Sequence, residues 1–387
     1  MNGKSICFLS WNGGFNKPGP LGISMFTTLD RYIIRKFFST FFFTVLIFTL
    51  ISVIIDFSEK VEKFIEEPIT RSEIFVEYYP SFILYMTGLL WPLFTLIAVI
   101  FFTSRLAFNS EIIAILNAGV SFNRFLRPYL FSAGVLTVLY LFGTHVLIPA
   151  GNKHMFRILY TYISKNEDKA RVRDIHLFVA PGKKVYIGYY SKSDSSVRDF
   201  RIEHFEGQRL TGLLKADRAQ WQQKTQKWRL YDYESRTFPD TIRERLFVGI
   251  GQQLDTVLNL SPADFVDYTS QQSMMSTRQL VRHIHLLGAR GAGNIRKYDL
   301  ELQRRTAEPI TIFILTIIGV AIAARKVRGG VGLHLAMGIG LGALYVFLSK
   351  FASTFAQDSD VPAWLGAWLP NFLFFTIALR LVSKAQK

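Results

Sequence analysis

Long runs of apolar residues without a charged side chain dominate both ends of this sequence, and a polar stretch lies between them. The runs match the length that crosses roughly 30 Å of bilayer hydrocarbon as a helix rising about 1.5 Å per residue. The shorter fourth run reaches that length by including Thr306 and Ala307, because Pro309 is tolerated near a helix start. The pattern therefore predicts six transmembrane helices, three on each side of the polar stretch. The six runs are Phe37–Ile55, Tyr78–Ser104, Pro128–Asn152, Pro309–Ala324, Val331–Ser349 and Val361–Leu379.

The polar insert, from about Gly151 to Arg305, changes to the alternating hydrophobic period of strands. Short strands about every ten residues, separated by turn signals, predict a β-sandwich or an open jelly roll. We therefore expect a β-jellyroll-like domain over 151–275 and helices over 276–305 that lead back to the membrane. Ser276 or Thr277 is the expected N-cap of the first of these helices. The alternating segments are Lys184–Tyr190, Phe200–Phe205, Trp228–Tyr233 and Arg245–Gly249.

Composition agrees with a membrane protein, because 50% of the 387 residues are hydrophobic and mean hydropathy is +0.22. Basic residues in short loops mark the cytoplasmic side of a membrane protein. The clusters beginning at Arg31, Arg105, Arg325 and Arg380 all fall on one side. Residues 56–77 carry seven acids against three bases and fall on the other side with the insert. Both termini are therefore expected in the cytoplasm. The net charge of +16 reflects these anchors and a basic insert, so no nucleic-acid partner is expected.

Residues 1–28 lack the apolar core of a signal peptide, so we expect a disordered N-terminal extension with Met25 as an alternative start. Cys7 is the only cysteine, which excludes an intramolecular disulfide and a cysteine metal cluster. His283 and His285 point to different faces of an amphipathic helix, so no metal is expected. No complete phosphate-binding loop is present either. We expect no cofactor and no catalytic residue, so ATP hydrolysis would need a separate subunit.

A short amphipathic segment, 109–119, lies between the second and third apolar runs. A helix over 110–118 would be only about 13 Å long and cannot cross a bilayer. Asn109 or Ser110 is the expected N-cap, and Gly119 the C-terminal glycine. Two interpretations stay open: a helix resting in lipid headgroups, or a docking helix that presents Glu111 to a cation of a soluble partner. The apolar face expected in either case comprises Ile112, Ile115 and Leu116.

The segment SEIIAILNAGVS, Ser110–Ser121, resembles the coupling-helix motif of the lipopolysaccharide-export permease family (LptF/LptG), nearer the G type. Other stretches resemble the family in the same order, and together they span residues 29 to about 382. The resemblance implies a helical inner-membrane protein that pairs with a second permease and binds a cytoplasmic ATPase subunit through the coupling helix. It also implies an inserted periplasmic β-jellyroll domain that passes lipopolysaccharide to jellyroll bridge proteins. The other stretches are Leu29–Ile33, Lys215–Leu230, Leu280–Arg305 leading to Glu308-Pro309, and Leu365–Asn371.

The resemblance implies the ATPase contact for Glu111, with Gly119 and the apolar residues of the same helix around it. Asp56 departs from the family pattern, because the G type has a lysine toward the outer end of span one. For the lipid, we expect cations at the rim of an apolar cavity, since extraction exposes apolar area at roughly 25 cal/mol per Å². Anchors that reach the headgroups and side chains that simply face lipid are the alternatives. The candidates are Lys60, Lys63, Lys153, Arg157 and Lys350 for phosphate and Phe41 and Phe48 for the apolar wall.

Gly338 and Gly342 stand in GxxxG spacing in span five, which lets two helix backbones approach closely. The resemblance implies a lateral gate between this span and span one of the partner permease, whereas static packing is the alternative. Three functions compete: an ATPase-coupled lipid permease, a scaffold that anchors an envelope β domain, and a polyprenyl-dependent membrane transferase. The transferase needs paired carboxylates at the membrane surface, for which only Asp358 and Asp360 qualify. We therefore expect the permease.

Overall fold

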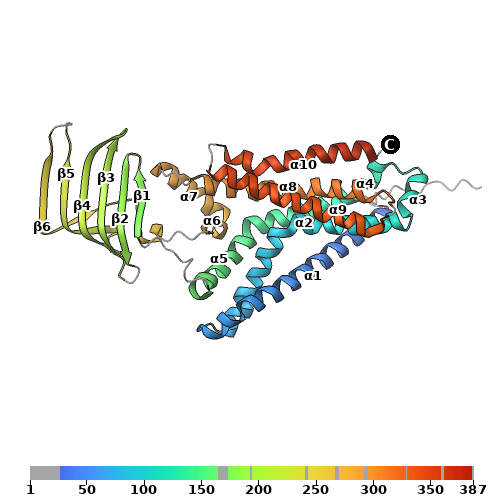
Figure 1. Ribbon diagram of the computed structural model, residues 1–387, viewed down its shortest axis with the longest axis horizontal. Helices are drawn as coiled ribbons and strands as arrows, with labels where there is room; N and C mark the ends of the chain where they lie inside the picture. Colours follow the sequence, from blue (N-terminus) through green and yellow to red (C-terminus); the bar gives the residue numbers. More distant parts are fainter. Residues whose placement is uncertain are drawn as a thin grey trace, which may run out of the picture.

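The computed structural model describes residues 27–163, 173–191, 194–239, 243–265, 270–291, 295–327, 329–358 and 361–385. The expectations for residues 1–26, Met25 among them, and for the pairing of Asp358 with Asp360 lie outside this part of the chain. The molecule is elongated, with a β-sheet at one end and the short helix α3 (Glu111–Asn117) at the other (Figure 1). A bundle of long helices lies between them, and the C-terminus lies at the α3 end.

Within the described residues, six helical segments are long and apolar enough to cross a membrane, which agrees with the predicted number and their three-plus-three order. Each extends beyond its charge-free run, because polar turns continue the same helices outside the apolar stretch. The third segment is the longest, running from Phe122 to Ile163. It therefore passes the domain boundary expected between residues 150 and 151. The bundle helices are α1 (Thr28–Glu66), α2 (Tyr79–Phe108), α4 (Phe122–Phe142), α5 (Ile148–Ile158), α8 (Ile295–Ala323), α9 (Gly330–Asp358) and α10 (Ala363–Ala385).

Three π-helical turns lie toward the β-domain end of the bundle. One, η1 (Glu73–Tyr78), precedes α2, and two others, η2 (Gly143–Leu147) and η3 (Leu159–Ile163), precede and follow α5. A π turn holds one more residue than an α turn and is rare in helices. Side chains of α1, η1, α2, α5 and η3 form a separate aromatic cluster there, which includes Phe64, Tyr78 and Phe156.

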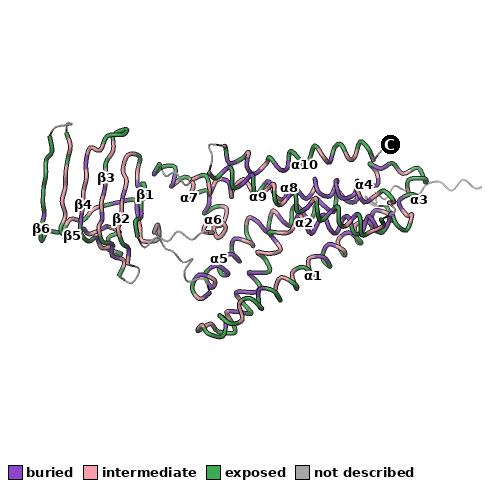
Figure 2. Tube along the Cα trace, viewed as in Figure 1, coloured by how far each residue is buried: buried purple, intermediate pink, exposed green. Residues whose placement is uncertain are grey.

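The helices differ in how much of their apolar surface the chain itself covers. Of the most apolar window in each segment, 67% is buried in α8 and 50% in the segment containing α2. The corresponding share is 11% in α1 and 22% in α9. Figure 2 shows the same contrast between the interior helices and α1. Two helices of the bundle therefore offer wide apolar faces to lipid or to another protein.

The β domain is one antiparallel sheet in the sequential order β1-β2-β3-β4-β5-β6. This order describes an open sheet rather than a two-sheet sandwich. Its core includes Ile187, Phe200 and Trp228 on one face, and the Trp228 Nε1 donates to the carbonyl of Leu260 at 2.8 Å. All four alternating segments lie within strands, as predicted. The strands are β1 (Arg173–Ala180), β2 (Lys183–Ser191), β3 (Ser196–Glu206), β4 (Arg209–Gln222), β5 (Lys227–Thr237) and β6 (Arg245–Thr256).

Two helices, α6 (Gln271–Met274) and α7 (Thr277–Arg290), connect the sheet to the bundle. Ser276 caps α7 with a capping box to Gln279, which confirms one of the two expected N-caps. Leu280 and Leu287 of α7 are buried in a cluster with Tyr298 at the start of α8. The connection is therefore packed and positions α7 beside the bundle.

Candidate functional site

The short helix α3 begins and ends at sharp backbone turns. Ser110 has φ +62° and Gly119 φ +85°, both in the left-handed region. Gly119 thus fills the C-terminal role expected from the sequence. Ser110, one of the two expected residues, is the N-cap, but its side chain makes no capping hydrogen bond. Instead Asn109 Nδ2 donates to Glu111 Oε1 at 3.2 Å, and Ser110 Oγ accepts from Lys326 Nζ at 3.0 Å.

The apolar face of α3 divides between the bundle and the surface. Ile112 is 1% exposed and packs into the main bundle core, and Ile115 packs against the same core. Leu116 lies on the surface. Ile113, which was not part of the predicted apolar face, is 45% exposed. The structure therefore places Ile112 and Ile115 as anchors of α3. Ile113 and Leu116 are its exposed apolar positions, and Glu111 at its start is half-buried.

Glu111 is linked to the start of the first helix, because its Oε2 accepts from Tyr32 Oη at 3.4 Å. Lys326, which bonds Ser110, lies in the connection between α8 and α9. Side chains thus connect α3 to α1 and to the segment before α9, in addition to the helices that flank it in sequence.

The lysines expected at the rim of span one are engaged within the chain. Lys60 forms an ion pair with the buried Asp56, and Tyr78 Oη donates to Asp56 Oδ2 at 3.1 Å. Lys63 Nζ donates to the carbonyl of Ile163 at 3.0 Å. The departure from the family pattern at Asp56 therefore has a structural role, since this carboxylate holds Lys60 against η1.

The two phenylalanines expected to form an apolar wall lie in different surroundings. Phe41 is fully buried and its ring lies 5.2 Å from that of Trp91, centroid to centroid. Phe48 is 38% exposed and contacts Phe94 on one side. Only Phe48 of this pair therefore belongs to the open apolar face of α1.

The GxxxG glycines of α9 face another helix of the same chain. A Cβ added at Gly338 would lie 2.3 Å from Ile100 Cδ1, and one at Gly342 the same distance from Leu93 Cδ1. Both contacts are with α2. The glycines therefore allow α9 to approach α2, while the exposed side of α9 carries large apolar residues such as Phe347 and Phe351.

Lys350 lines a cavity of about 200 Å³ inside the bundle, toward the β-domain end. Arg304 and Glu308 line it too, and Arg304 Nε donates to Glu308 Oε1 at 3.0 Å. Tyr140 Oη donates to the other oxygen of Glu308 at 3.1 Å. This polar cluster was missed as a site, although the i, i+4 spacing of an arginine and a glutamate was visible in the sequence.

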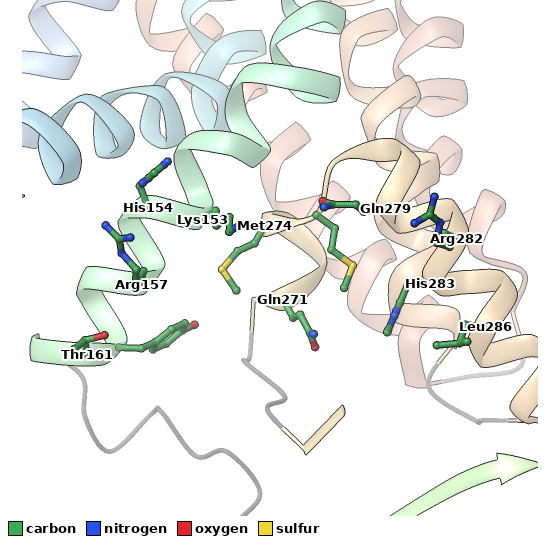
Figure 3. A pocket seen from close by; sticks show the side chains of 12 residues that line it. Lys153, His154, Arg157, Thr161, Gln271, Met274, Gln279, Arg282, His283 and Leu286 are labelled. Carbon is green, nitrogen blue, oxygen red and sulfur yellow. The ribbon is translucent and has the colours of Figure 1, made fainter. Parts of the chain in front are cut away.

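A larger cavity, about 710 Å³ in volume, lies between α5 and the α6–α7 connection (Figure 3). Lys153, His154 and Arg157 line one wall, and Gln279, Arg282 and His283 line the other. Arg157 forms an ion pair with Glu77, which is not among the lining residues. The structure therefore places Lys153 and Arg157, which were expected to contact the substrate, in the same cavity as Arg282 and His283. These two basic residues lie more than 100 positions later, and no sequence pattern indicated that they share a site with Lys153.

The fold and these sites define a multi-pass helical membrane protein, with a β domain inserted after the third span and a short helix at the opposite end of the bundle. The family model described as "Lipopolysaccharide export system permease LptF/LptG" matches residues 31–384, and the chain belongs to this family. The lipopolysaccharide export system permease protein LptG of Haemophilus influenzae (strain ATCC 51907 / DSM 11121 / KW20 / Rd) is 20% identical over 377 residues. The match covers 94% of this chain and 100% of that protein. Membership supports a permease subunit of lipopolysaccharide export over a scaffold or a transferase.

Proposed function

We propose that this chain is the membrane half of an ATP-driven transporter, which extracts lipopolysaccharide from the inner membrane and passes it to a periplasmic protein bridge. The observation that carries the proposal is the position of α3. This helix, which carries Glu111 and the exposed Ile113 and Leu116, lies at the opposite end of the molecule from the β domain (Figure 1). With the β domain in the periplasm, α3 meets a cytoplasmic ATPase. Short apolar helices with one acid suit docking into a groove.

A second permease would complete the transport path. The open apolar faces of α1 and α9 are poorly covered within this chain. A pair of such chains would enclose apolar space that replaces the lipid around acyl chains, which lowers the cost of extracting them. Phe48 belongs to this surface. The engagement of Lys60 and Lys63 leaves Lys153 as the better candidate for a phosphate contact, with Arg157, which pairs with Glu77, beside it.

The bridge proteins would meet the sheet at β6, the last strand in its order. An edge strand offers backbone groups to a strand of another β domain. Phe247 and Ile250 of β6 are 53% and 83% exposed, so apolar side chains add to this edge. Transfer from the bundle to a neighbouring β domain at this end agrees with the elongated shape of the molecule.

Charge reversal at Glu111 tests the proposal. The ATPase should copurify with the wild-type permease from membranes, and Glu111→Lys should abolish that copurification because a like charge would face the partner's cation. Glu66→Lys, an exposed acid at the far end of α1, is the matched control and should retain the ATPase. A scaffold would be indifferent to Glu111. Equal ATPase recovery with both variants would therefore contradict the proposed coupling surface.

A further inference from the structure

The 710 Å³ cavity has two facing walls that are each one stripe of a helix. On α7 the lining residues Gln279, Arg282, His283 and Leu286 follow the i, i+3, i+4, i+7 spacing of a single helix face. The other wall is a stripe of α5 and η3, which begins with Lys153 and His154 and continues at Arg157 and Tyr160. Figure 3 shows the two stripes on opposite sides of the same space. The cavity is thus built from two elements that are far apart in sequence.

The charges of the side chains that line the cavity favour an anionic ligand. Lys153, Arg157 and Arg282 are cations, two histidines accompany them, and none of the twelve lining residues is an acid. The carboxylate of Glu77, which does not line the cavity, forms an ion pair with Arg157. Neither Lys153 nor Arg282 has an ion pair or side-chain hydrogen bond within the part of the chain that the structure describes. Arginine forks and lysine ammonium groups bind phosphate through charge-assisted hydrogen bonds.

Other lining residues give the cavity an apolar part. Met274, Met275 and Leu286 lie among the polar residues, and the Tyr160 ring stacks on Phe156 at 5.6 Å. Methionine side chains adapt to irregular apolar groups. The wall formed by α5 also continues directly from the third membrane-spanning segment. An amphiphile at the membrane boundary matches this mixture better than a small soluble anion.

We infer that this cavity binds the phosphate-bearing headgroup of an anionic lipid, held between Lys153 on α5 and Arg282 on α7. The inference deepens the proposed function, and it rests on that function for one of the two lipids that carry such a headgroup. These are the phosphorylated sugars of lipopolysaccharide and an anionic phospholipid of the surrounding membrane.

The position of α7 gives such binding a second consequence. Arg290, near the end of α7, is buried and its Nη1 donates to Asp264 Oδ1 at 2.9 Å, in the segment that follows β6. A headgroup that contacts both walls therefore joins the membrane bundle to the helix that leads from the sheet. Binding holds the β domain in one orientation relative to the bundle.

Photo-crosslinking on the full-length permease tests the site. A photoreactive residue replaces Gln279, and the protein is reconstituted in zwitterionic lipid with lipopolysaccharide, with lipopolysaccharide stripped of phosphate, or with phosphatidylglycerol. We expect capture of phosphate-bearing lipid and at least a tenfold loss of apparent affinity in the double variant Lys153→Gln, Arg282→Gln. Arg278→Gln, one turn earlier on α7 and outside the cavity, is the control for loss of a single arginine charge from the same helix and should bind like the wild type. Capture of lipopolysaccharide alone identifies the glycolipid as the source, and capture of phosphatidylglycerol identifies the membrane phospholipid.

Hydrogen exchange on the same samples measures the second consequence. Bound lipid should slow exchange over 276–290 and 153–161 in the wild type and not in the double variant. Equal capture of intact and phosphate-free lipopolysaccharide would overturn the inference, as would capture that the double variant leaves unchanged. ATPase copurification is measured in parallel, so a failure of this site is distinct from a failure of the proposed coupling at α3.

Discussion

Individual charged residues in this molecule act mostly by holding helices together. Asp30 near the start of α1 accepts hydrogen bonds from Nη1 and Nη2 of Arg124, at 2.7 and 2.6 Å, and so joins α1 to α4. Asp56, 26 residues later, joins α1 to η1 through Lys60 and Tyr78. Both aspartates are buried. A charge that is buried with a partner becomes costly once that partner is removed.

Replacing Asp56 should therefore destabilise the permease. Asp56→Asn leaves the Lys60 ammonium without its counter-charge, and breaking a buried pair of this kind costs about 3 to 5 kcal/mol. The prediction is a lower melting temperature of the purified protein in detergent. A double variant, Asp56→Leu with Lys60→Met, removes both charges and should recover most of the loss. A melting temperature that Asp56→Asn leaves unchanged would show that the pair contributes nothing to stability.

At the scale of the elements, the glycines of α9 pack differently according to the side of the helix on which they lie. Gly338 and Gly342 contact α2, whereas a Cβ at Gly340 would meet nothing within 4 Å. Gly338→Ala should therefore cost about 1 to 3 kcal/mol of stability through overpacking against Ile100. Gly340→Ala is the matched control and should be neutral or slightly stabilising, since alanine favours helix. Thermal unfolding compares the two, and equal melting temperatures would contradict the close approach of α9 to α2.

The helix α3 makes a similar distinction between its two sides. Ile113 is exposed and Ile112 is buried, although they are adjacent and identical in type. Ile113→Asp should abolish ATPase copurification and change the melting temperature little, because its side chain is 45% exposed in the free permease and the new carboxylate reaches water. Ile112→Asp should lower the melting temperature, because it buries an unpaired carboxylate in the bundle core. Loss of the ATPase with Ile112→Asp alone would assign the docking surface to the other side.

At the scale of the whole molecule, the arrangement predicts opposite accessibility for the two ends. With Cys7 replaced by serine, single cysteines at the exposed positions Ala118 and Gly207 report on the α3 end and on the β domain. A maleimide that cannot cross the inner membrane should label Gly207→Cys in cells with a permeable outer membrane. It should label Ala118→Cys only after the inner membrane is opened. Labelling of Ala118→Cys in intact inner membranes would exclude a cytoplasmic ATPase contact at α3.

Large-scale features were predictable from sequence because they follow from local composition. A charge-free run such as Phe37–Ile55 has one low-energy arrangement in a bilayer, whatever its neighbours. Strands with large alternating residues, such as β2 with Val185 and Ile187, were equally clear. The strand β4 was missed because its buried positions are Gly212, Ala216 and Ala219, which give no hydrophobic contrast.

The details of the sites depend on contacts that a local pattern does not contain. The position of Glu111 on a short helix was visible in the sequence, but the inward turn of Ile112 results from packing into the bundle core. The large cavity was missed for the same reason, since Lys153 and Arg282 line it from opposite sides although the β domain separates them in sequence. The fold was therefore predictable from the hydrophobic periodicity of the sequence, whereas the geometry of the sites was not.

The π turn at Gly143–Leu147 has a consequence for the spacing of the chain. If these residues wound as a regular α-helix instead, everything beyond them would rotate by roughly the 100° of one residue around the helix axis, because a π turn holds about one residue more than an α turn. The third span would still cross the bilayer, but Lys153 and Arg157 would point away from α7. The π turn therefore keeps Lys153 and Arg157 on the side of α7, so we expect that deleting one residue within 143–147 restores an α-helix and leaves both side chains in place, whereas deleting one residue from the regular helix before it turns them away.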